Sequence, residues 1–392
     1  MNDPIVICGY ARTPMGGMMG ALADVPSPQL GASAIEAAMQ RAGVKSDDVD
    51  EALLGCVLPA GVGQAPARQA ALGAGLPIST AATTVNKMCG SGMKTVMMAC
   101  DTLLSGQSDV VVAGGMENMS SAPYLLQKAR GGYRLGHGEL LDHLYTDGLQ
   151  DAYTGGLMGV FAESCAEKYT FTREAQDAYA IESLRRANSA IDEGKFSREI
   201  APVTVKTRKG EIVIDTDEQP GNARPDKIPN LKPVFKSGGS VTAANASSIS
   251  DGAAALVLMR QSEAEKRGLK PLAAIRGYSQ FAQEPEWFTT APVGAMKLLF
   301  ERTGWSAEDV DLYEVNEAFA VVAMAAMHEL EIPHDKVNVH GGACALGHPL
   351  GASGARIIVT LLSALETYGK TKGVASLCIG GGEATAIAVE LL

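Results

Sequence analysis

A weak internal repeat is the feature that most constrains the fold of this chain. Arg41-Ala42-Gly43 through Asp48-Val49-Asp50 matches Arg302-Thr303-Gly304 through Asp309-Val310-Asp311. Glycine-rich helix starts follow both stretches at nearly equal spacing, and strand-like runs ending in glycine follow at 109–115 and 374–381. Several elements match in the same order, which favours true repetition over chance similarity between two ordinary α/β units. The sequence therefore predicts two related α/β domains packed face to face.

The periodicity of apolar residues predicts the kind of element on each side of the repeat. Apolar residues after Gly92 follow a helical period, at Met93, Val96, Met97, Cys100, Leu103 and Leu104. Short runs rich in Val and Ile, such as 5–8, 274–276 and 336–339, alternate with helical stretches. This alternation is typical of mixed or parallel sheets covered by helices.

The middle of the chain has a different pattern from the two repeats. It contains a glycine-rich run at 131–136, a long polar helix near 172–194 and a proline-rich stretch from Pro202 to Pro233. Such a segment is typical of an insertion rather than a core domain. We therefore predict an N-terminal core domain at 1–118 and 250–268, a loop domain at 119–249 and a C-terminal core domain at 269–392.

Composition narrows the class of protein. Of 392 residues, 46% are hydrophobic and 20% charged, which is ordinary for a globular protein, and the net charge of −11 has no basic stripe. We therefore expect neither nucleic acid nor a membrane as a partner. Seven cysteines without a Cys-x-x-Cys pair argue against a disulfide framework or zinc ribbon and favour a cytoplasmic protein. The start of the chain has no charged leader, and no apolar run approaches the roughly 18 residues that span a bilayer.

Cys89 stands at the start of the predicted helix, followed by Gly90, Ser91 and Gly92. Backbone N–H groups and the helix dipole at such a position lower a thiol pKa and favour the thiolate, which attacks carbonyl carbons. We therefore predict that Cys89 is a nucleophile. The cysteines at 8, 56, 100 and 165 are expected to be buried core residues.

His348 and Cys378 complete the candidate thiol chemistry. His348 stands in a turn rich in glycine, at Gly347, Gly351 and Gly354, which favours a catalytic role over ordinary packing. Cys378 precedes three glycines at 380–382, whose N–H groups are suited to form an oxyanion hole.

Other motifs allow alternative interpretations. Cys344 and His348 have the i, i+4 spacing of metal ligands, but Gly347 and Pro349 break a helix there, so no metal is expected. Asn316 follows the strand-like run 312–315 and opens a helix through Met327, where either a helix cap or a site residue fits. The glycine pairs at 114–115 and 238–239 lack the context of a dinucleotide site.

Four segments together resemble the signature blocks of the thiolases, and more closely those of the acetyl-CoA acetyltransferases. They are 86–92, 316–319, 341–349 and 378–382, in that order, and the resemblance spans nearly the whole chain. It implies the thiolase fold: two related mixed-sheet α/β core domains in five layers (αβαβα) plus a loop domain. It also implies a homotetramer, a dimer of dimers, in which residues 128–143 resemble the tetramerisation loop.

The resemblance assigns a role to each catalytic candidate. Cys89 would be the acylated nucleophile, His348 would activate it, and Cys378 would move the α-proton of the second acyl-CoA. The Nε2 atom of His348 and a water held by Asn316 would stabilise the enolate oxygen. Backbone N–H groups of Cys89 and Gly380 would stabilise the oxyanion of the acyl-enzyme.

The resemblance also implies the residues that contact substrate. Ser247 would contact the pantetheine arm, and Met158, Phe235 and Phe319 would line the tunnel and acyl pocket. The full set of expected contacts is Leu157, Met158, Arg224, Phe235, Ala243, Ser247, Ala318 and Phe319.

Three positions depart from the family pattern. Leu157 stands where a histidine is frequent, His340 where asparagine is usual, and the basic residue expected soon after Asp217-Glu218 is displaced to Arg224 or Lys227. Some relatives bind potassium near the loop 243–246, but Gln219 stands where a tyrosine helps there. We expect no cofactor beyond the coenzyme A substrates.

The expected activity is the reversible condensation of two acetyl-CoA to acetoacetyl-CoA and CoA through an acetyl-Cys89 intermediate. The alternatives are a 3-ketoacyl-CoA thiolase of β-oxidation acting on longer chains and a non-catalytic thiolase-like lipid-binding protein. A ketoacyl or hydroxymethylglutaryl-CoA synthase should lack Cys378 before three glycines. The intact set of Cys89, Asn316, His348 and Cys378 argues against a scaffold, whereas Met158 and the stretch 284–292 favour a short acyl chain.

Overall fold

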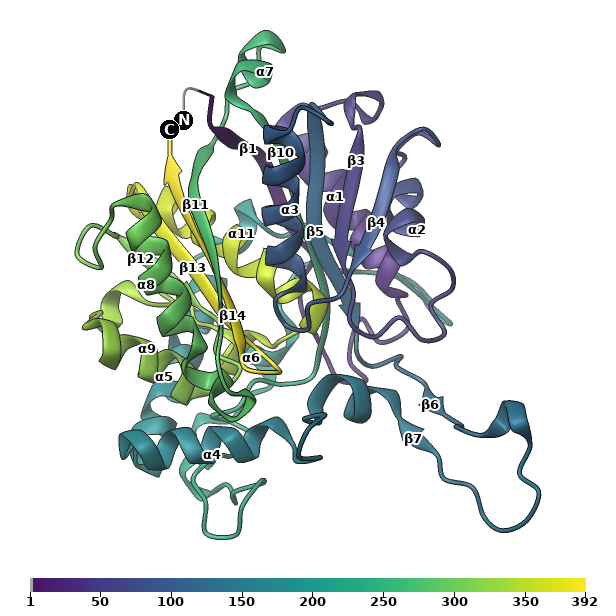
Figure 1. Ribbon diagram of the computed structural model, residues 1–392, viewed down its shortest axis with the longest axis vertical. Helices are drawn as coiled ribbons and strands as arrows, with labels where there is room; N and C mark the ends of the chain where they lie inside the picture. The colour runs from purple at the N-terminus through teal and green to yellow at the C-terminus, as the bar shows by residue number, and fades with distance from the viewer. Residues whose placement is uncertain (1–2) are drawn as a thin grey trace.

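The computed structural model describes residues 3–392, and its two halves follow the sequence repeat (Figure 1). The first half contains β1 (Ile5–Arg12), β2 (Gly16–Gly17), α1 (Ser27–Ala42), η1 (Ser46–Asp48), β3 (Glu51–Gly55), α2 (Pro66–Gly73), β4 (Ala81–Val85), α3 (Ser91–Leu104), β5 (Val110–Asn118), β10 (Ser250–Arg260) and α7 (Gln261–Lys266). The second half contains β11 (Ala273–Ala282), η6 (Pro285–Thr290), α8 (Ala291–Thr303), β12 (Leu312–Val315), α9 (Ala320–Leu330), η7 (His334–Lys336), α10 (Ala343–Leu346), α11 (Leu350–Tyr368), β13 (Lys372–Ile379) and β14 (Glu383–Leu391).

The segment between β5 and β10 adds no strand to the main sheet. Its elements are β6 (Tyr124–Leu125), η2 (Ala129–Gly131), β7 (Leu141–Asp142), η3 (Leu144–Leu149), α4 (Met158–Tyr169), α5 (Arg173–Asp192), η4 (Lys195–Arg198), β8 (Val203–Thr207), β9 (Gly210–Ile214), α6 (Glu218–Asn222) and η5 (Pro225–Asn230). The long polar helix predicted near 172–194 is confirmed as α5.

The strands of both halves form one mixed sheet of ten strands, in the order β12-β13-β14-β11-β1-β10-β5-β3-β4 with β2 paired to β10. Within each half, β3 runs parallel to β4 and β5, and β12 parallel to β13, while the remaining pairs are antiparallel. The halves join where β1 pairs with β11 over the short register of Val6 and Ile7 with Ala274 and Ala273. The two predicted sheets are therefore continuous at this narrow contact.

The aspartates that match in the sequence repeat accept equivalent backbone hydrogen bonds in each half. The side-chain oxygen Oδ2 of Asp50 accepts from the N–H groups of Asp109 and Val110, and that of Asp311 accepts from Thr371 and Lys372. Each aspartate thereby links the start of one strand to the start of its parallel neighbour in the sheet. The helices before them end on glycines with φ of 68° and 70°, in the left-handed region that glycine adopts without strain.

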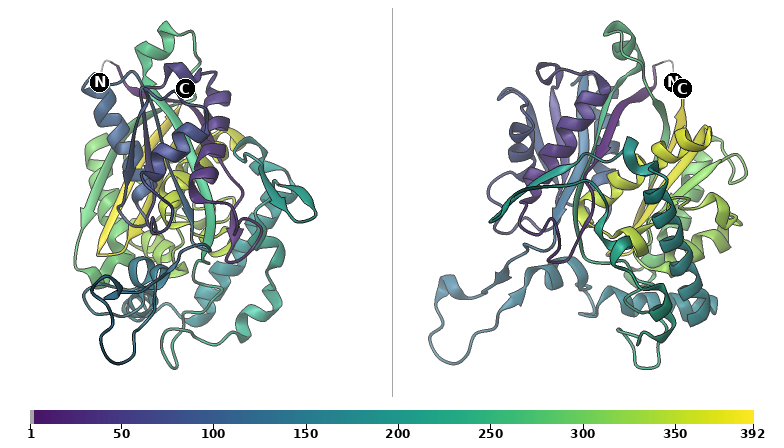
Figure 2. Two further views of the ribbon diagram at one scale, coloured as in Figure 1. Left: turned by 90° about the vertical axis from the view of Figure 1, so that its right-hand side faces the viewer. Right: turned by 180° about the vertical axis from the view of Figure 1, so that it is seen from behind.

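The helices and the two halves of the sheet stack in five layers (αβαβα), which confirms the predicted architecture (Figure 2). Helices α1 and α2 contact the outer face of the first half, and α8 and α9 cover the outer face of the second. Helix α3 and helix α11 lie in the middle layer, where α11 contacts β5 and β10 from one half and β12 and β13 from the other.

The middle-layer helix α11 corrects the expectation about apolar runs. Its 19 residues are long and apolar enough to cross a membrane by length and composition, with a mean hydropathy of 1.2. However, 89% of this window is buried inside the protein. A helix packed between two sheets is surrounded by core on all sides and is therefore mainly apolar.

One local prediction is wrong. Residues 336–339 form no strand, because Asn338 has a φ of 49° and the segment makes only a single bridge, between Val337 and Tyr313. The side chain of Asn338 instead donates to the Val315 carbonyl and accepts from its N–H, replacing the strand partner that β12 lacks there. The predicted helical run after Gly92 is confirmed as α3, which includes Leu104 as its exposed last residue.

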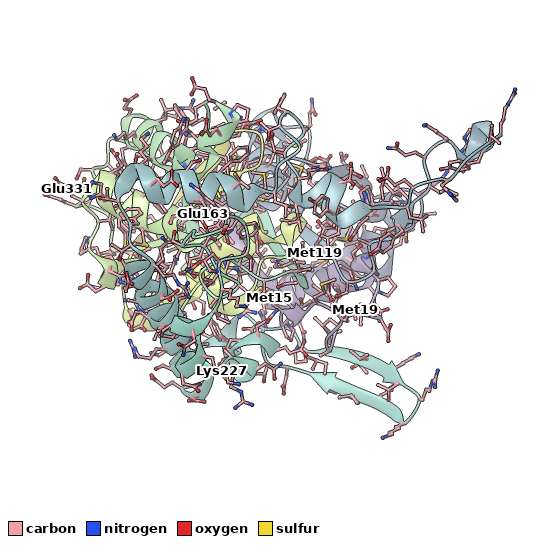
Figure 3. The ribbon with its side chains drawn as sticks, turned by 90° about the horizontal axis from the view of Figure 1, so that it is seen from below. Met15, Met19, Met119, Glu163, Lys227 and Glu331 are labelled. Atoms are coloured by element: carbon pink, nitrogen blue, oxygen red, sulfur yellow. The ribbon has the colours of Figure 1, made fainter. Side chains whose placement is uncertain are left out.

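Two parts of the middle segment project from the body (Figure 3). One is the arm formed by β6, η2 and β7 with the loop between them, and the other is the β8–β9 hairpin. The arm carries apolar side chains in solvent, with Leu135 99% exposed and Leu140 64% exposed.

Candidate active site

A cavity of about 660 Å³ lies where the two halves and the middle segment meet. Its wall includes most of the residues predicted to act or bind there, namely Cys89, Leu157, Met158, Phe235, Ala243, Ser247, Ala318, Phe319, His348 and Gly380. Cys378 and Asn316 are buried outside this lining. Arg224 is exposed at the start of η5 and does not line the cavity, so its predicted contact would lie outside it.

Cys89 lies in a tight turn just before α3, as predicted. Met88 has a φ of 47°, and the amide of Asn86 accepts from its N–H. The Ser91 hydroxyl donates to the Met88 carbonyl at 2.6 Å and accepts from the Lys87 N–H at 2.9 Å. These bonds hold a strained backbone in place and direct the thiol to the cavity.

The prediction that the thiol pKa of Cys89 is lowered is wrong for the free protein. Burial raises this pKa to about 11, while the N–H groups of Gly380 and of Cys89 itself act in the opposite direction. Desolvation disfavours the thiolate more strongly than two backbone donors favour it. Cys89 is therefore a neutral thiol near pH 7 and needs a base. The same two N–H groups are the donors predicted to form the oxyanion hole.

His348 has the surroundings of such a base. Its side chain is 5% exposed, and within residues 3–392 its Nε2 atom has no hydrogen-bond partner. Its Nδ1 atom lies 2.6 Å from the Ser353 hydroxyl, which is also 2.9 Å from the Pro349 carbonyl. Because the single hydroxyl proton goes to that carbonyl, Nδ1 donates to Ser353 and Nε2 keeps its lone pair.

The charge state of His348 is set by its surroundings. Burial, and then the positive charge of Arg356, lower the pKa of His348 to about 3. The imidazole is therefore neutral near pH 7, as a proton acceptor must be.

Cys378 is the last residue but one of the buried strand β13 and is fully buried. Burial raises its pKa well above the usual thiol value, and the charge of a Cys89 thiolate raises it further. The two thiols are thus close enough that their titrations are linked. Beyond Cys378 the chain turns sharply, since Gly381 and Gly382 have φ of 94° and 90°, and a Cβ on Gly382 would lie 2.3 Å from the Gln283 carbonyl oxygen.

Asn316 is not a helix cap, and it lies beside His348. Helix α9 begins at Ala320 with Phe319 as its N-cap, whereas Asn316 is 1% exposed with its Nδ2 atom 3.4 Å from Nδ1 of His348. The proposed i, i+4 pairing of Cys344 and His348 does not form a helix face, because α10 ends at Leu346 and Gly347 has a φ of 106°. Within residues 3–392, no group of three or more His, Cys, Asp or Glu side chains is arranged to hold a metal.

Four buried polar side chains around these residues were not predicted. They are Glu117, Glu314, Ser353 and Arg356. Glu117 accepts from the N–H groups of Val57, Leu58 and Gly351, and burial raises its pKa to about 7. The sequence signal for Arg356 is its own charge, which stands inside the otherwise apolar stretch 350–365.

Together the site offers a thiol, a neutral imidazole and two N–H groups on one mainly apolar cavity, with a second thiol buried outside its lining. A thiol beside a base forms covalent acyl intermediates, and paired N–H groups stabilise the oxyanion that forms on the way. The second thiol can exchange a proton with a group held beside the first. This is the chemistry of acyl transfer between thiols and carbon.

Comparison with known proteins agrees with this geometry. The chain matches the thiolase N-terminal domain over residues 5–262 and the thiolase C-terminal domain over residues 269–391. It is 52% identical to acetyl-CoA acetyltransferase 2 of Arabidopsis thaliana, covering 99% of this chain and 97% of that protein. It is 49% identical to an acetyl-CoA acetyltransferase of Chromobacterium violaceum, covering 98% and 99%.

Solved structures extend the similarity to three dimensions. The Bacillus anthracis acetyl-CoA acetyltransferase is 42% identical with a TM-score of 0.97, covering 100% of this chain and 99% of that one. A thiolase from Ascaris suum in complex with coenzyme A is 42% identical with a TM-score of 0.95, covering 99% and 100%. Since both family domains match in order and account for nearly the whole chain, the protein belongs to the thiolase family of acyltransferases.

Proposed function

We propose that the protein is an acetyl-CoA C-acetyltransferase that condenses two acetyl-CoA to acetoacetyl-CoA and CoA, and runs the reverse thiolysis. The observation that carries this proposal is the joint placement of Cys89 and neutral His348 on one cavity, with the Cys378 thiol buried outside its lining. The names of the relatives support acetyl-CoA as the substrate.

Acylation begins with transfer of the Cys89 thiol proton to Nε2 of His348. The thiolate attacks the thioester carbonyl, whose oxyanion receives hydrogen bonds from the N–H groups of Cys89 and Gly380. The bond between the carbonyl carbon and the CoA sulfur breaks, and the CoA thiolate takes the proton of Cys378. This leaves acetyl-Cys89, protonated His348 and a Cys378 thiolate, so charge and protons balance.

Condensation uses the thiolate that acylation creates. Cys378 removes an α-proton from the second acetyl-CoA, and the resulting carbanion attacks the acetyl carbon on Cys89. The Cys89 sulfur leaves and recovers its proton from His348, while Cys378 keeps the abstracted proton. A thiolate is a weak base for this step even with the raised pKa of Cys378. The enolate oxygen must therefore be stabilised, which is the role proposed for protonated His348 and for a water held by Asn316.

The acyl end of the cavity favours a short chain. Met158 lies beside Gly380, and the Phe319 ring packs against Phe235 and Phe288 at centroid distances of 6.0 and 6.4 Å. Each added methylene costs about 1–3 kcal/mol in discrimination, so some activity on five-carbon substrates is expected. Thiolysis rates measured from C4 to C12 test this: equal or higher activity at C10 and beyond would favour the β-oxidation alternative.

Covalent labelling separates the enzyme from a non-catalytic lipid-binding protein. Incubation with acetyl-CoA, followed by peptide mapping, should find the acetyl group on Cys89 and none after Cys89→Ser. Labelling of another cysteine would refute the assignment, and absence of any label would favour the binding protein.

We also propose a homotetramer that works in the cytoplasm without a cofactor beyond its coenzyme A substrates. The exposed apolar side chains of the arm, including Tyr124, Leu135 and Leu140, support association through this segment. Sedimentation of the wild type and a Leu135→Glu variant tests the assembly, and the variant should dissociate towards dimers.

A further inference from the structure

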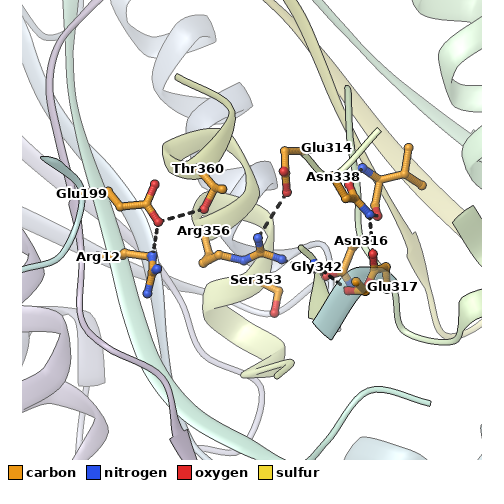
Figure 4. Close-up of polar contacts among 12 residues, drawn as sticks. Arg12, Glu199, Glu314, Asn316, Glu317, Asn338, Gly342, Ser353, Arg356 and Thr360 are labelled. Carbon is orange, nitrogen blue, oxygen red and sulfur yellow. Dashed lines mark hydrogen bonds and ion pairs between the residues drawn. The ribbon is translucent and has the colours of Figure 1, made fainter. Parts of the chain in front are cut away.

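A buried arginine–glutamate pair lies beside Asn316. The Nη1 atom of Arg356 on α11 lies 3.2 Å from Oε2 of Glu314 on β12, and both side chains are 2% exposed (Figure 4). Nη2 of the same guanidinium lies 3.4 Å from Oδ1 of Asn316. The pair therefore contacts a residue that itself lies beside the His348 ring.

A buried pair of this kind stabilises a core less than apolar side chains do. Within residues 3–392, neither Nε of Arg356 nor Oε1 of Glu314 has a hydrogen-bond partner. Burying a guanidinium and a carboxyl group costs more free energy than burying apolar side chains of similar size. Packing alone therefore does not account for this pair. Burial also raises the pKa of Glu314 to about 8, which shows how weakly its single contact with Arg356 compensates for desolvation.

The contact with Asn316 has a directional consequence. An amide side chain has an acceptor end and a donor end, and either can face a neighbour that both donates and accepts. A guanidinium only donates, so it accepts no hydrogen bond from the NH₂ group. With Oδ1 facing Arg356, the NH₂ group of Asn316 must point the other way, to the His348 ring, where Nδ2 is 3.4 Å from Nδ1.

The NH₂ group has no good acceptor on that ring. Ser353 already takes the Nδ1 proton at 2.6 Å, so the ring nitrogen that Nδ2 faces is itself a donor. The amide protons are thus left for an oxygen atom in the site. A water that accepts from this NH₂ group keeps both of its protons for the enolate oxygen, whereas in the opposite orientation the Asn316 carbonyl oxygen would take one of them.

We propose that Arg356 is a positioning residue that fixes the orientation of the Asn316 amide, so that its NH₂ group and not its carbonyl oxygen serves the reacting thioester. Glu314 holds Arg356 in place from its other side. The inference rests on the proposed function, because it requires that Asn316 act on the enolate oxygen during condensation.

The test is a double-variant cycle in a Glu314→Gln background. Glutamine keeps an acceptor for Arg356 and resembles the protonated form of Glu314, so removal of Arg356 from this background leaves no unpaired buried carboxylate. The variants added to it are Arg356→Gln, Asn316→Ala, and both together, with Arg356→Lys as the conservative replacement. Thr360→Val, one turn further along α11, is the matched control, because it removes only the contact between Thr360 and Glu199 at 3.2 Å (Figure 4).

The expected result is coupling through Asn316. Arg356→Gln should lower kcat for condensation by about 10–100-fold with little change in KM, since a misoriented group costs up to about 10²-fold. With Asn316→Ala already present, the same change should cost less than about twofold, because residues that act as a unit are not additive. Arg356→Lys should restore part of the loss, and Thr360→Val should match the wild type.

Two results would overturn the inference. One is a multiplicative loss in the combined variant, which would mean that Arg356 acts independently of Asn316. The other is a loss in Arg356→Gln that appears equally in acetylation of Cys89, since a general disturbance of the fold would slow both steps. A wild-type protein that is not acetylated by acetyl-CoA would instead refute the proposed function and leave the geometry of Arg356 untouched.

Discussion

The crossing of α3 and α11 controls the distance between the nucleophile and its base, and Gly354→Ala tests this directly. Cys89 precedes α3 and His348 precedes α11, so any separation of the helices moves the two side chains apart. A Cβ on Gly354 would lie 2.3 Å from the Met93 backbone nitrogen, against an ordinary contact of 3.4 Å or more. The helices must therefore separate by about 1 Å, because the contact is with backbone and cannot be relieved by a rotamer change.

The size of the effect follows from this displacement. A misplacement of about 1 Å costs about 10²-fold in rate, and overpacking of a tight core costs about 1–3 kcal/mol in stability. We therefore expect acetylation of Cys89, followed by mass spectrometry after rapid quenching, to slow by about two orders of magnitude. Thermal unfolding should shift downwards by a few degrees while the cooperative transition remains.

A matched glycine provides the control for this experiment. Gly221 lies in α6 with no atom within 4 Å of its Cβ position, so Gly221→Ala should leave both the acetylation rate and the melting temperature unchanged. If Gly354→Ala acetylated Cys89 at the wild-type rate, helix spacing would not set the geometry of the thiol and the imidazole.

Two further predictions concern individual residues. Cys378→Ser should still accept an acetyl group on Cys89 but lose condensation and α-proton exchange of acetyl-CoA by about 10²–10⁴-fold, measured by deuterium incorporation, and rapid exchange would show that the roles are assigned wrongly. Burial lowers the pKa of His340 to about 4, so the unfolded protein binds its proton first as pH falls, and the folded protein loses stability between about pH 6.5 and 4. His340→Asn should therefore gain up to about 3 kcal/mol relative to the wild type over that window in urea unfolding, and a difference independent of pH would contradict the shift.

The candidate catalytic residues could be predicted because their signals are local. Cys89 stands beside Gly90 and Gly92, and His348 stands among glycines, and in both places a close backbone approach demands glycine. A Cβ on Gly92 would lie 2.8 Å from the Ala355 nitrogen, for example. The repeat was equally readable, because Asp50 and Asp311 make the same backbone contacts in both halves.

The features that escaped prediction depend on residues far apart in the chain. Arg356 and Glu314 are 42 positions apart, and no local pattern shows that they meet. The raised pKa of Cys89 also depends on distant residues. The helix start is visible in the sequence, whereas the burial that outweighs its effect comes from packing of both halves. The strand expected at 336–339 failed because a single side chain, that of Asn338, took over the hydrogen bonds of a strand.

The duplication explains why the two members of the acylation pair meet. Cys89 lies two residues before α3, and His348 lies two residues before α11, so both occupy equivalent positions of the repeat. The two helices share the middle layer and contact each other, which brings both starts to the same cavity. Each half alone presents one partner: a thiol without its base, or an imidazole with no thiol to deprotonate. The reactive pair exists only because the two halves pack together, and so the tight glycine contacts between α3 and α11 are as much a part of the chemistry as the side chains they align.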